Sequence, residues 1–224
     1  IFSFCALAQE KCATNFIQAN QYQQSHTDQF ESWLRQKKRI NQQTFFDGVN
    51  RQSVYQIPVV FHVIHDGSAI GAGSNLADEK LIEQLTVINQ DFRRTNPDAS
   101  ETPSEFLGVA ADSEIEFVLA KQDPEGLTTS GIVRKRGSKS VYSPNDDRTL
   151  KAESAWPQED YLNIYITNLS GGNLGYAQFP FSNIDGIANE LENYRSTDGV
   201  VLDYEWVGFN DNTSGFDSKG RTAT

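Results

Sequence analysis

The stretch that decides the fold is Val54-Tyr-Gln-Ile-Pro-Val-Val-Phe-His-Val-Ile-His65. It is dense in β-branched and aromatic residues, which is the composition of a buried strand. Pro58 is expected near the start of this strand, because proline cannot donate a hydrogen bond within a sheet. Residues three apart on a strand point to opposite faces, so His62 and His65 could not easily bind one ion. We interpret them as packed strand histidines rather than as a metal pair.

An amphipathic helix is predicted after the glycine-rich turn that follows this strand. Its apolar residues are spaced by four, three and four positions: Leu81, Leu85, Ile88 and Phe92. This spacing places them on one face of a helix. Asn75 is a suitable N-cap, and the helix should end near Asn96-Pro97.

Further strands are predicted along the rest of the chain. They are expected at residues 115–120, 161–167 and 198–204, with a short edge strand at residues 175–180 that ends at a proline. A strand, a helix and then several strands indicate an α/β or α+β sheet domain. No GxxxxGK[ST] phosphate loop and no GxSxG nucleophile turn occurs in the sequence.

The first eight residues are apolar and end in Ala6-Leu-Ala8, the small-x-small form that signal peptidase cleaves. We interpret residues 1–8 as the remnant of a signal peptide, which predicts a secreted protein; the alternative is a short buried strand. Cleavage after Ala8 would leave Cys12 as a single cysteine. An unpaired cysteine in a secreted protein is either a free thiol with a function or the partner of a cysteine beyond Thr224.

Residues 15–43 are rich in glutamine and asparagine and are expected to form a helix, with Phe30, Trp33 and Leu34 on one face. The basic run at residues 35–39 suits a solvated helix C-terminus, and the alternative is a processing site. The chain carries 30 acidic and 19 basic residues, a formal net charge of -11. This charge repels phosphate backbones and anionic lipid surfaces, so we expect neither a nucleic-acid partner nor a membrane-surface partner. We also expect no membrane insertion after signal removal.

Short segments in sequence order resemble the pappalysin family of metzincin zinc metallopeptidases. They are residues 57–62, 88–93 with Asn96, 110–112, 115–117, 131–132, 161–164, 174–180, 198–201 and 220–222. The resemblance runs from about residue 54 to the end. It implies a metzincin-like upper subdomain, a twisted mixed sheet of about five strands packed on a long helix, over residues 54–224. Residues 9–53 would then be a helical pro-segment.

In that family, the element after Gly-Arg-Thr is a helix with the motif HExxHxxGxxH, whose histidines bind zinc. The resemblance therefore implies zinc as a cofactor, with its ligands and all catalytic groups expected beyond Thr224, and it allows for calcium. Some family members are kept latent by a cysteine switch, in which a pro-segment thiolate binds the zinc. Cys12 is the candidate for this role, and a disulfide to the part beyond Thr224 is the alternative.

The resemblance also implies where a protein or peptide substrate binds. Metzincins add an extended peptide to the edge strand of the upper sheet. The expected substrate-binding residues are Gly175, Tyr176, Ala177, Gln178 and Phe179. The predicted function is a secreted zinc-dependent endopeptidase precursor, with residues 1–224 alone inactive. The alternative is a secreted, non-catalytic binding or adhesion module that uses the same sheet edge.

Overall fold

The computed structural model describes residues 12–14, 32, 35–36, 54–178, 196–209 and 219–223. The expected signal-peptide remnant, most of the helix expected over residues 15–43, and Phe179 lie outside the described residues. The three proposed divisions of the chain therefore remain predictions. No helix in the described part of the chain is long and apolar enough to cross a lipid bilayer.

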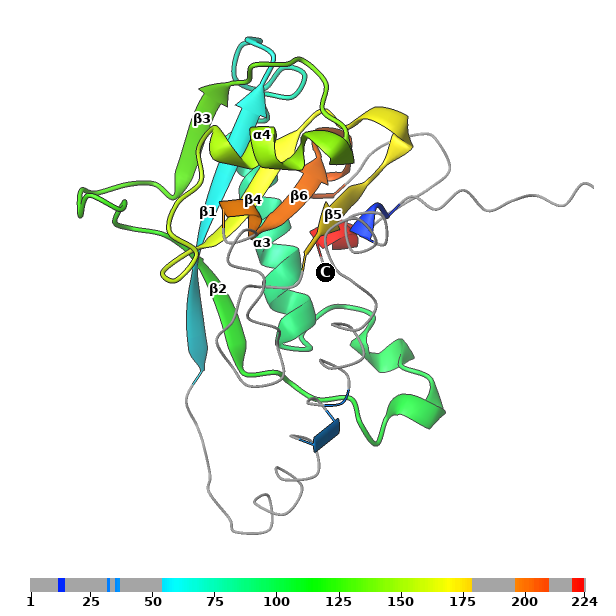
Figure 1. Cartoon of the computed structure of the whole chain (residues 1–224). Helices are drawn as coiled ribbons and strands as arrows, with labels where there is room; N and C mark the ends of the chain where they lie inside the picture. Colours follow the sequence, from blue (N-terminus) through cyan, green and yellow to red (C-terminus); the bar gives the residue numbers. More distant parts are fainter. Residues whose placement is uncertain are drawn as a thin grey trace, which may run out of the picture.

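Six strands form one mixed sheet (Figure 1). They are β1 (Tyr55–His65), β2 (Ile115–Leu119), β3 (Ile132–Arg136), β4 (Leu162–Thr167), β5 (Gly175–Ala177) and β6 (Val200–Asp203). The order across the sheet is β2-β1-β4-β6-β5, with β3 also paired to β1. All pairs are parallel except that of β5 with β6, which places a short antiparallel strand at one edge. The α/β fold class and the edge strand predicted from the sequence are confirmed.

Strand β3 was not predicted. It pairs with the second half of β1, from Phe61 to His65, while β2 pairs with the first half. Its sequence, Ile132-Val-Arg-Lys-Arg136, ends in three basic residues and is only partly buried, so it lacks the apolar pattern of the other strands. Gly131 precedes it with φ +74°. A Cβ there would lie 2.9 Å from the backbone nitrogen of Ala120, so the close approach requires glycine.

The two faces of the sheet bury two separate cores, because side chains alternate along each strand. The first core joins Val59, Phe61, Ile164 and Leu202 to helix α3 (Asp78–Phe92). The second core lies on the opposite face and includes Ile64, Tyr165 and Val201 together with Leu150 of helix α4 (Asp147–Ala152). Figure 1 shows α3 behind the sheet and α4 in front of it.

The predicted helix is confirmed as α3, but both of its ends differ from the expectation. Its N-cap is Ala77, which makes no side-chain cap bond, and its last residue is Phe92. Asn75 is not the N-cap, because its amide is engaged elsewhere: it donates to the Ser68 carbonyl at 2.8 Å and accepts from Arg134 at 2.7 Å. Arg94 has a left-handed backbone with φ 52°, which ends the helix before the expected Asn96-Pro97.

Candidate functional site

The outer edge of β5 carries a segment from the opposite end of the chain. Strand β5 pairs with β6 along one edge. Along the other edge, Cys12 forms a parallel bridge with Gly175, and the Ala13 N–H donates to the Gly175 carbonyl at 3.1 Å. The Ala177 N–H donates to Thr14 Oγ1 at 3.1 Å. Cys12 and Ala13 therefore bind this edge through main-chain pairing, as an added strand begins to, while Thr14 is helical and contacts the edge through its hydroxyl.

The side chains of Cys12 and Ala13 lie on opposite sides of the sheet. Gly175 is paired with Leu202, which belongs to the core beneath α3. Since Cys12 is bridged to Gly175, its side chain lies on the α3 side, where it is exposed and donates to Thr14 Oγ1 at 3.2 Å. Ala13 points to the other side and is 6% exposed, within the second core.

The residues 219–223 are fixed on the α3 side of the sheet. Arg221 lies in the short 3-10 helix η8 (Arg221–Ala223) and binds Asp91 through Nε at 3.0 and 3.1 Å. Its Nη1 donates to Asp98 at 2.7 Å. The Arg221 guanidinium is the main reason why the pKa of Asp98 is far below its ordinary value. Ala223 packs against the first core, so this segment and the Cys12 thiol share one side of the molecule.

Gln84 of α3 holds the same region from within the protein. Its side chain is wholly buried. Its amide nitrogen donates to the Gly220 carbonyl at 2.8 Å, and its Oε1 accepts from the Gly208 N–H at 3.0 Å. One buried amide thus joins helix α3 to two backbone segments that follow β6.

Beneath β5, a buried ion pair of helix α4 supports the edge strand. Lys151 is wholly buried and binds Asp147 at 2.9 Å. It donates to the Thr197 carbonyl at 2.5 Å, and its ammonium lies 5.6 Å from the centre of the Tyr176 ring. Burial lowers the pKa of Lys151, an effect that Asp147 opposes. Burial, and then Asp147, raises the pKa of Tyr176.

Gln178 is connected to the same network. The Thr197 hydroxyl donates to Gln178 Oε1 at 2.9 Å, and both side chains are buried. The Lys151 ammonium therefore interacts with the Tyr176 ring through its charge. It is connected to Gln178 through Thr197, whose carbonyl accepts from Lys151 and whose hydroxyl donates to Gln178. The sequence analysis did not identify this support, although Asp147 and Lys151 stand four residues apart, which is the spacing of a helical ion pair.

His62 is a packed strand histidine, as predicted. Its ring stacks on that of Tyr165, with 4.7 Å between the ring centres, and meets that of Trp156 edge-on, with 6.1 Å between the ring centres. The Asn163 amide is fixed by the backbone of Trp156, so its Oδ1 accepts from the Nε2–H of His62 at 2.8 Å. Burial lowers the pKa of His62 to about 4, although the Asn163 bond opposes the shift. The ring is therefore neutral and serves packing.

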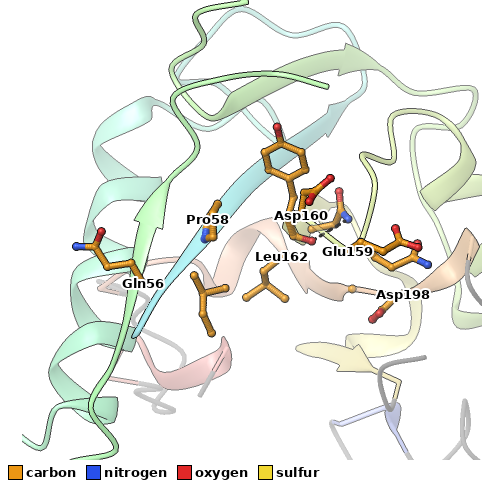
Figure 2. Close-up of a pocket in the computed structure, with 11 residues that line it drawn as sticks. Gln56, Pro58, Glu159, Asp160, Leu162 and Asp198 are labelled. Atoms are coloured by element: carbon orange, nitrogen blue, oxygen red, sulfur yellow. Dashed lines mark hydrogen bonds between the residues drawn. The ribbon is translucent and has the colours of Figure 1, made fainter. Parts of the chain in front are cut away.

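A hollow of about 360 Å³ opens at the amino-terminal ends of the parallel strands (Figure 2). Gln56 and Pro58 of β1 and Leu162 of β4 line it, together with three carboxylates, Glu159, Asp160 and Asp198. None of the described residues that line it is a histidine or a cysteine. Within the described ranges, no three histidine, cysteine or acidic side chains are grouped to hold a metal ion. Cys12 could supply one thiolate ligand, but the described residues do not form a complete zinc site.

The structure brings most of the predicted site residues together. Gly175, Tyr176 and Ala177 form β5, Gln178 follows it, and Cys12 lies on its edge. Phe179 lies outside the described residues. The sequence analysis missed Ala13 and Thr14, which make the main-chain and hydroxyl contacts to β5. Their position next to Cys12 was the available signal.

Comparison with solved structures found likenesses to mirolysin. The chain is 42% identical to mirolysin in complex with compound 9, with a TM-score of 0.64, and 42% identical to mature mirolysin of Tannerella forsythia in complex with a cleaved peptide, with a TM-score of 0.65. Each alignment covers 77% of this chain and 61% of that chain. A T. forsythia promirolysin mutant is 35% identical, with a TM-score of 0.68, over 95% of this chain and 66% of that chain.

The chain thus spans about three fifths to two thirds of the length of these structures. The promirolysin alignment includes more of this chain than the two mature ones do. No family model and no curated protein matches the chain.

Proposed function

We propose that this chain, whose likeness to mirolysin supports the metzincin family of metallopeptidases, is part of the latent precursor of a secreted zinc-dependent endopeptidase of the pappalysin type. The protein would hydrolyse peptide bonds in proteins, with the substrate bound as an added strand on β5. Gly175, Tyr176, Ala177, Gln178 and Phe179 would line its non-primed side. Residues 12–14 would block this edge until the pro-segment is removed.

One observation carries the proposal: the segment of Cys12, Ala13 and Thr14 already occupies the edge of β5. Main-chain bonding to a sheet edge is a general mode of peptide recognition, because it does not depend on the peptide sequence. A segment of the same chain that satisfies these groups competes with a substrate. Occupation of the edge in the precursor is therefore a means of inhibition.

The position of Cys12 supports a role in latency. Its thiol lies on the α3 side of the sheet, and so does η8, after which the resemblance expects the zinc-binding helix. A thiolate is a good zinc ligand and would occupy the position that a catalytic water needs. Cys12 would therefore contribute to the zinc site only in the latent form. Among the described residues, no three histidine, cysteine or acidic side chains are grouped to hold a metal ion.

The test uses the full-length precursor with Cys12→Ala and Cys12→Ser. We expect both variants to show peptidase activity before pro-segment cleavage that is at least about tenfold above the wild type, because each lacks the thiolate. Cleavage of a quenched fluorescent peptide, with and without a zinc chelator, measures this. Ala13→Ser, which keeps the thiol, is the matched control and should remain latent.

Two other results would count against the proposal. Unchanged latency in both Cys12 variants would remove the cysteine switch and favour a disulfide or packing role for Cys12. If the processed full-length protein cleaves no peptide but still binds extended peptides through the β5 edge, the protein is a non-catalytic binding module instead.

A further inference from the structure

The edge of β5 has one side-chain position that points into the fold, and Ala13 fills it. Cys12 is bridged to Gly175, so the next residue, Ala13, lies level with Tyr176. The two side chains share the second core with Val201 and Leu169. Ala13 is only 6% exposed, although it lies beyond β5, the last strand in the described order of the sheet. A side chain at this level is therefore enclosed, whereas that of Cys12 is exposed.

The walls of this position are fixed. Tyr176 is 3% exposed and lies against the Lys151 ammonium, which is itself held by Asp147. The Leu169 N–H donates to the Asp203 carboxylate at 2.7 Å, which holds that part of the core in place. Because protein interiors are close-packed, a larger side chain in this space would displace a neighbour that has nowhere to move.

The side-chain position beside Tyr176 is the same whether the bound strand runs parallel or antiparallel to β5. Side chains alternate between the two faces of any strand, whether it runs parallel or antiparallel to its neighbour. The residue opposite Tyr176 therefore points into the same space in residues 12–14 and in any other peptide that pairs with β5. Ala13 reports the size of side chain that fits there.

We infer that the depression beside Tyr176 is a size-selective subsite, which accepts glycine, alanine or serine at one position of an extended peptide substrate and excludes larger side chains. This inference rests on the proposed peptidase function. It assigns Tyr176 as a residue that determines specificity, and it names the substrate class: peptides with a small residue at one fixed non-primed position.

The first experiment uses the complete chain and does not require activity. In the protein with residues 12–14 bound, exchange of the Ala177 amide reports docking, because this N–H donates to Thr14 Oγ1. Ala13→Ser should keep the wild-type exchange rate within about twofold, and Ala13→Phe should raise it by about tenfold or more. Ala69→Phe, the same substitution at an exposed alanine away from the β5 edge, is the matched control and should also stay within about twofold. Wild-type protection of Ala177 in Ala13→Phe would overturn the inference.

The second experiment measures cleavage of a positional peptide library by the processed full-length protein. We expect one non-primed position to accept glycine, alanine and serine at least about tenfold better than valine, leucine or phenylalanine. Tyr176→Leu should reduce this preference for small residues, because leucine is smaller than tyrosine and leaves more space beside the bound residue. Equal cleavage of small and large residues at every non-primed position would overturn the subsite. Absence of all cleavage would count against the peptidase function alone, and the exchange measurement would then decide the subsite.

Discussion

At the scale of single residues, His62 makes the stability of the fold depend on pH. Its pKa is lowered from 6.5 to about 4 by burial, so the folded state favours the neutral ring. The sign follows from linkage: the stabilisation is fully present above the unfolded pKa of 6.5 and is lost as the pH falls toward 4. The unfolded chain binds the proton more readily over this range.

We therefore predict that His62→Phe reduces the pH dependence of unfolding. Between pH 7 and pH 5, the wild type should lose about 2 kcal/mol of unfolding free energy that the variant retains. Phenylalanine keeps a ring against Tyr165, and Asn163 Oδ1 still accepts from the Trp156 N–H. Urea unfolding of both proteins at the two pH values measures the difference, in which the carboxylates common to both proteins cancel. Parallel pH curves would contradict the prediction.

At the scale of elements, helix α4 should stabilise the sheet through one ion pair. Lys151→Met leaves the buried Asp147 carboxylate without its cation, and we expect a loss of about 3–5 kcal/mol. Lys139→Met is the matched control: it breaks a pair with Asp146 in which the lysine is 48% exposed, and should cost at most about 1 kcal/mol. Chemical unfolding of the two variants compares them. Equal losses of unfolding free energy in the two variants would mean that the buried Asp147–Lys151 pair stabilises the fold no more than the exposed pair does.

The edge strand β5 allows a prediction about main-chain bonding. The Ala177 N–H points outward to Thr14, so Ala177→Pro removes this donor and leaves the β6 side of the strand intact. We expect kcat/KM of the processed full-length protein on peptides to fall by about tenfold, the value of one hydrogen bond. Ala177→Ser keeps the N–H and should stay close to the wild type. Unchanged kcat/KM in the proline variant would exclude β5 as the substrate edge.

The elements also show what the sequence could predict and what it could not. Composition predicted β1, which is rich in β-branched and aromatic residues, while alternation predicted β4 and helical spacing predicted α3. Strand β3 was missed because it ends in three basic residues and so lacks a regular apolar pattern. It forms a strand because its backbone pairs with β1. The pairing of Cys12 with Gly175 joins residues more than 160 positions apart, and no local pattern indicates such a contact. The resemblance identified both partners, but not their contact.

At the scale of the whole molecule, the described residues hold the β5 edge and the segment at Arg221 in place, but no three of their histidine, cysteine or acidic side chains are grouped to hold a metal ion. Asp91 of helix α3 binds Arg221. Helix α4 supports Tyr176 through Lys151, and residues 12–14 contact the outer edge of β5. A peptidase zinc site needs three protein ligands and one open position. Under the proposed function, the Cys12 sulfur would fill only the open position of such a site.

We therefore predict that purified protein consisting of residues 1–224 shows no zinc-dependent proteolysis. It should retain less than one equivalent of zinc after dialysis against a weak chelator, because one thiolate holds the metal poorly compared with three ligands. Metal analysis and cleavage of a quenched peptide library measure the two properties. The matched sample is the full-length protein under the same conditions, which should retain zinc and, once processed, cleave peptides. Chelator-sensitive cleavage by residues 1–224 alone would mean that these residues themselves complete a zinc site, and the proposed division between support and catalytic part would then be wrong.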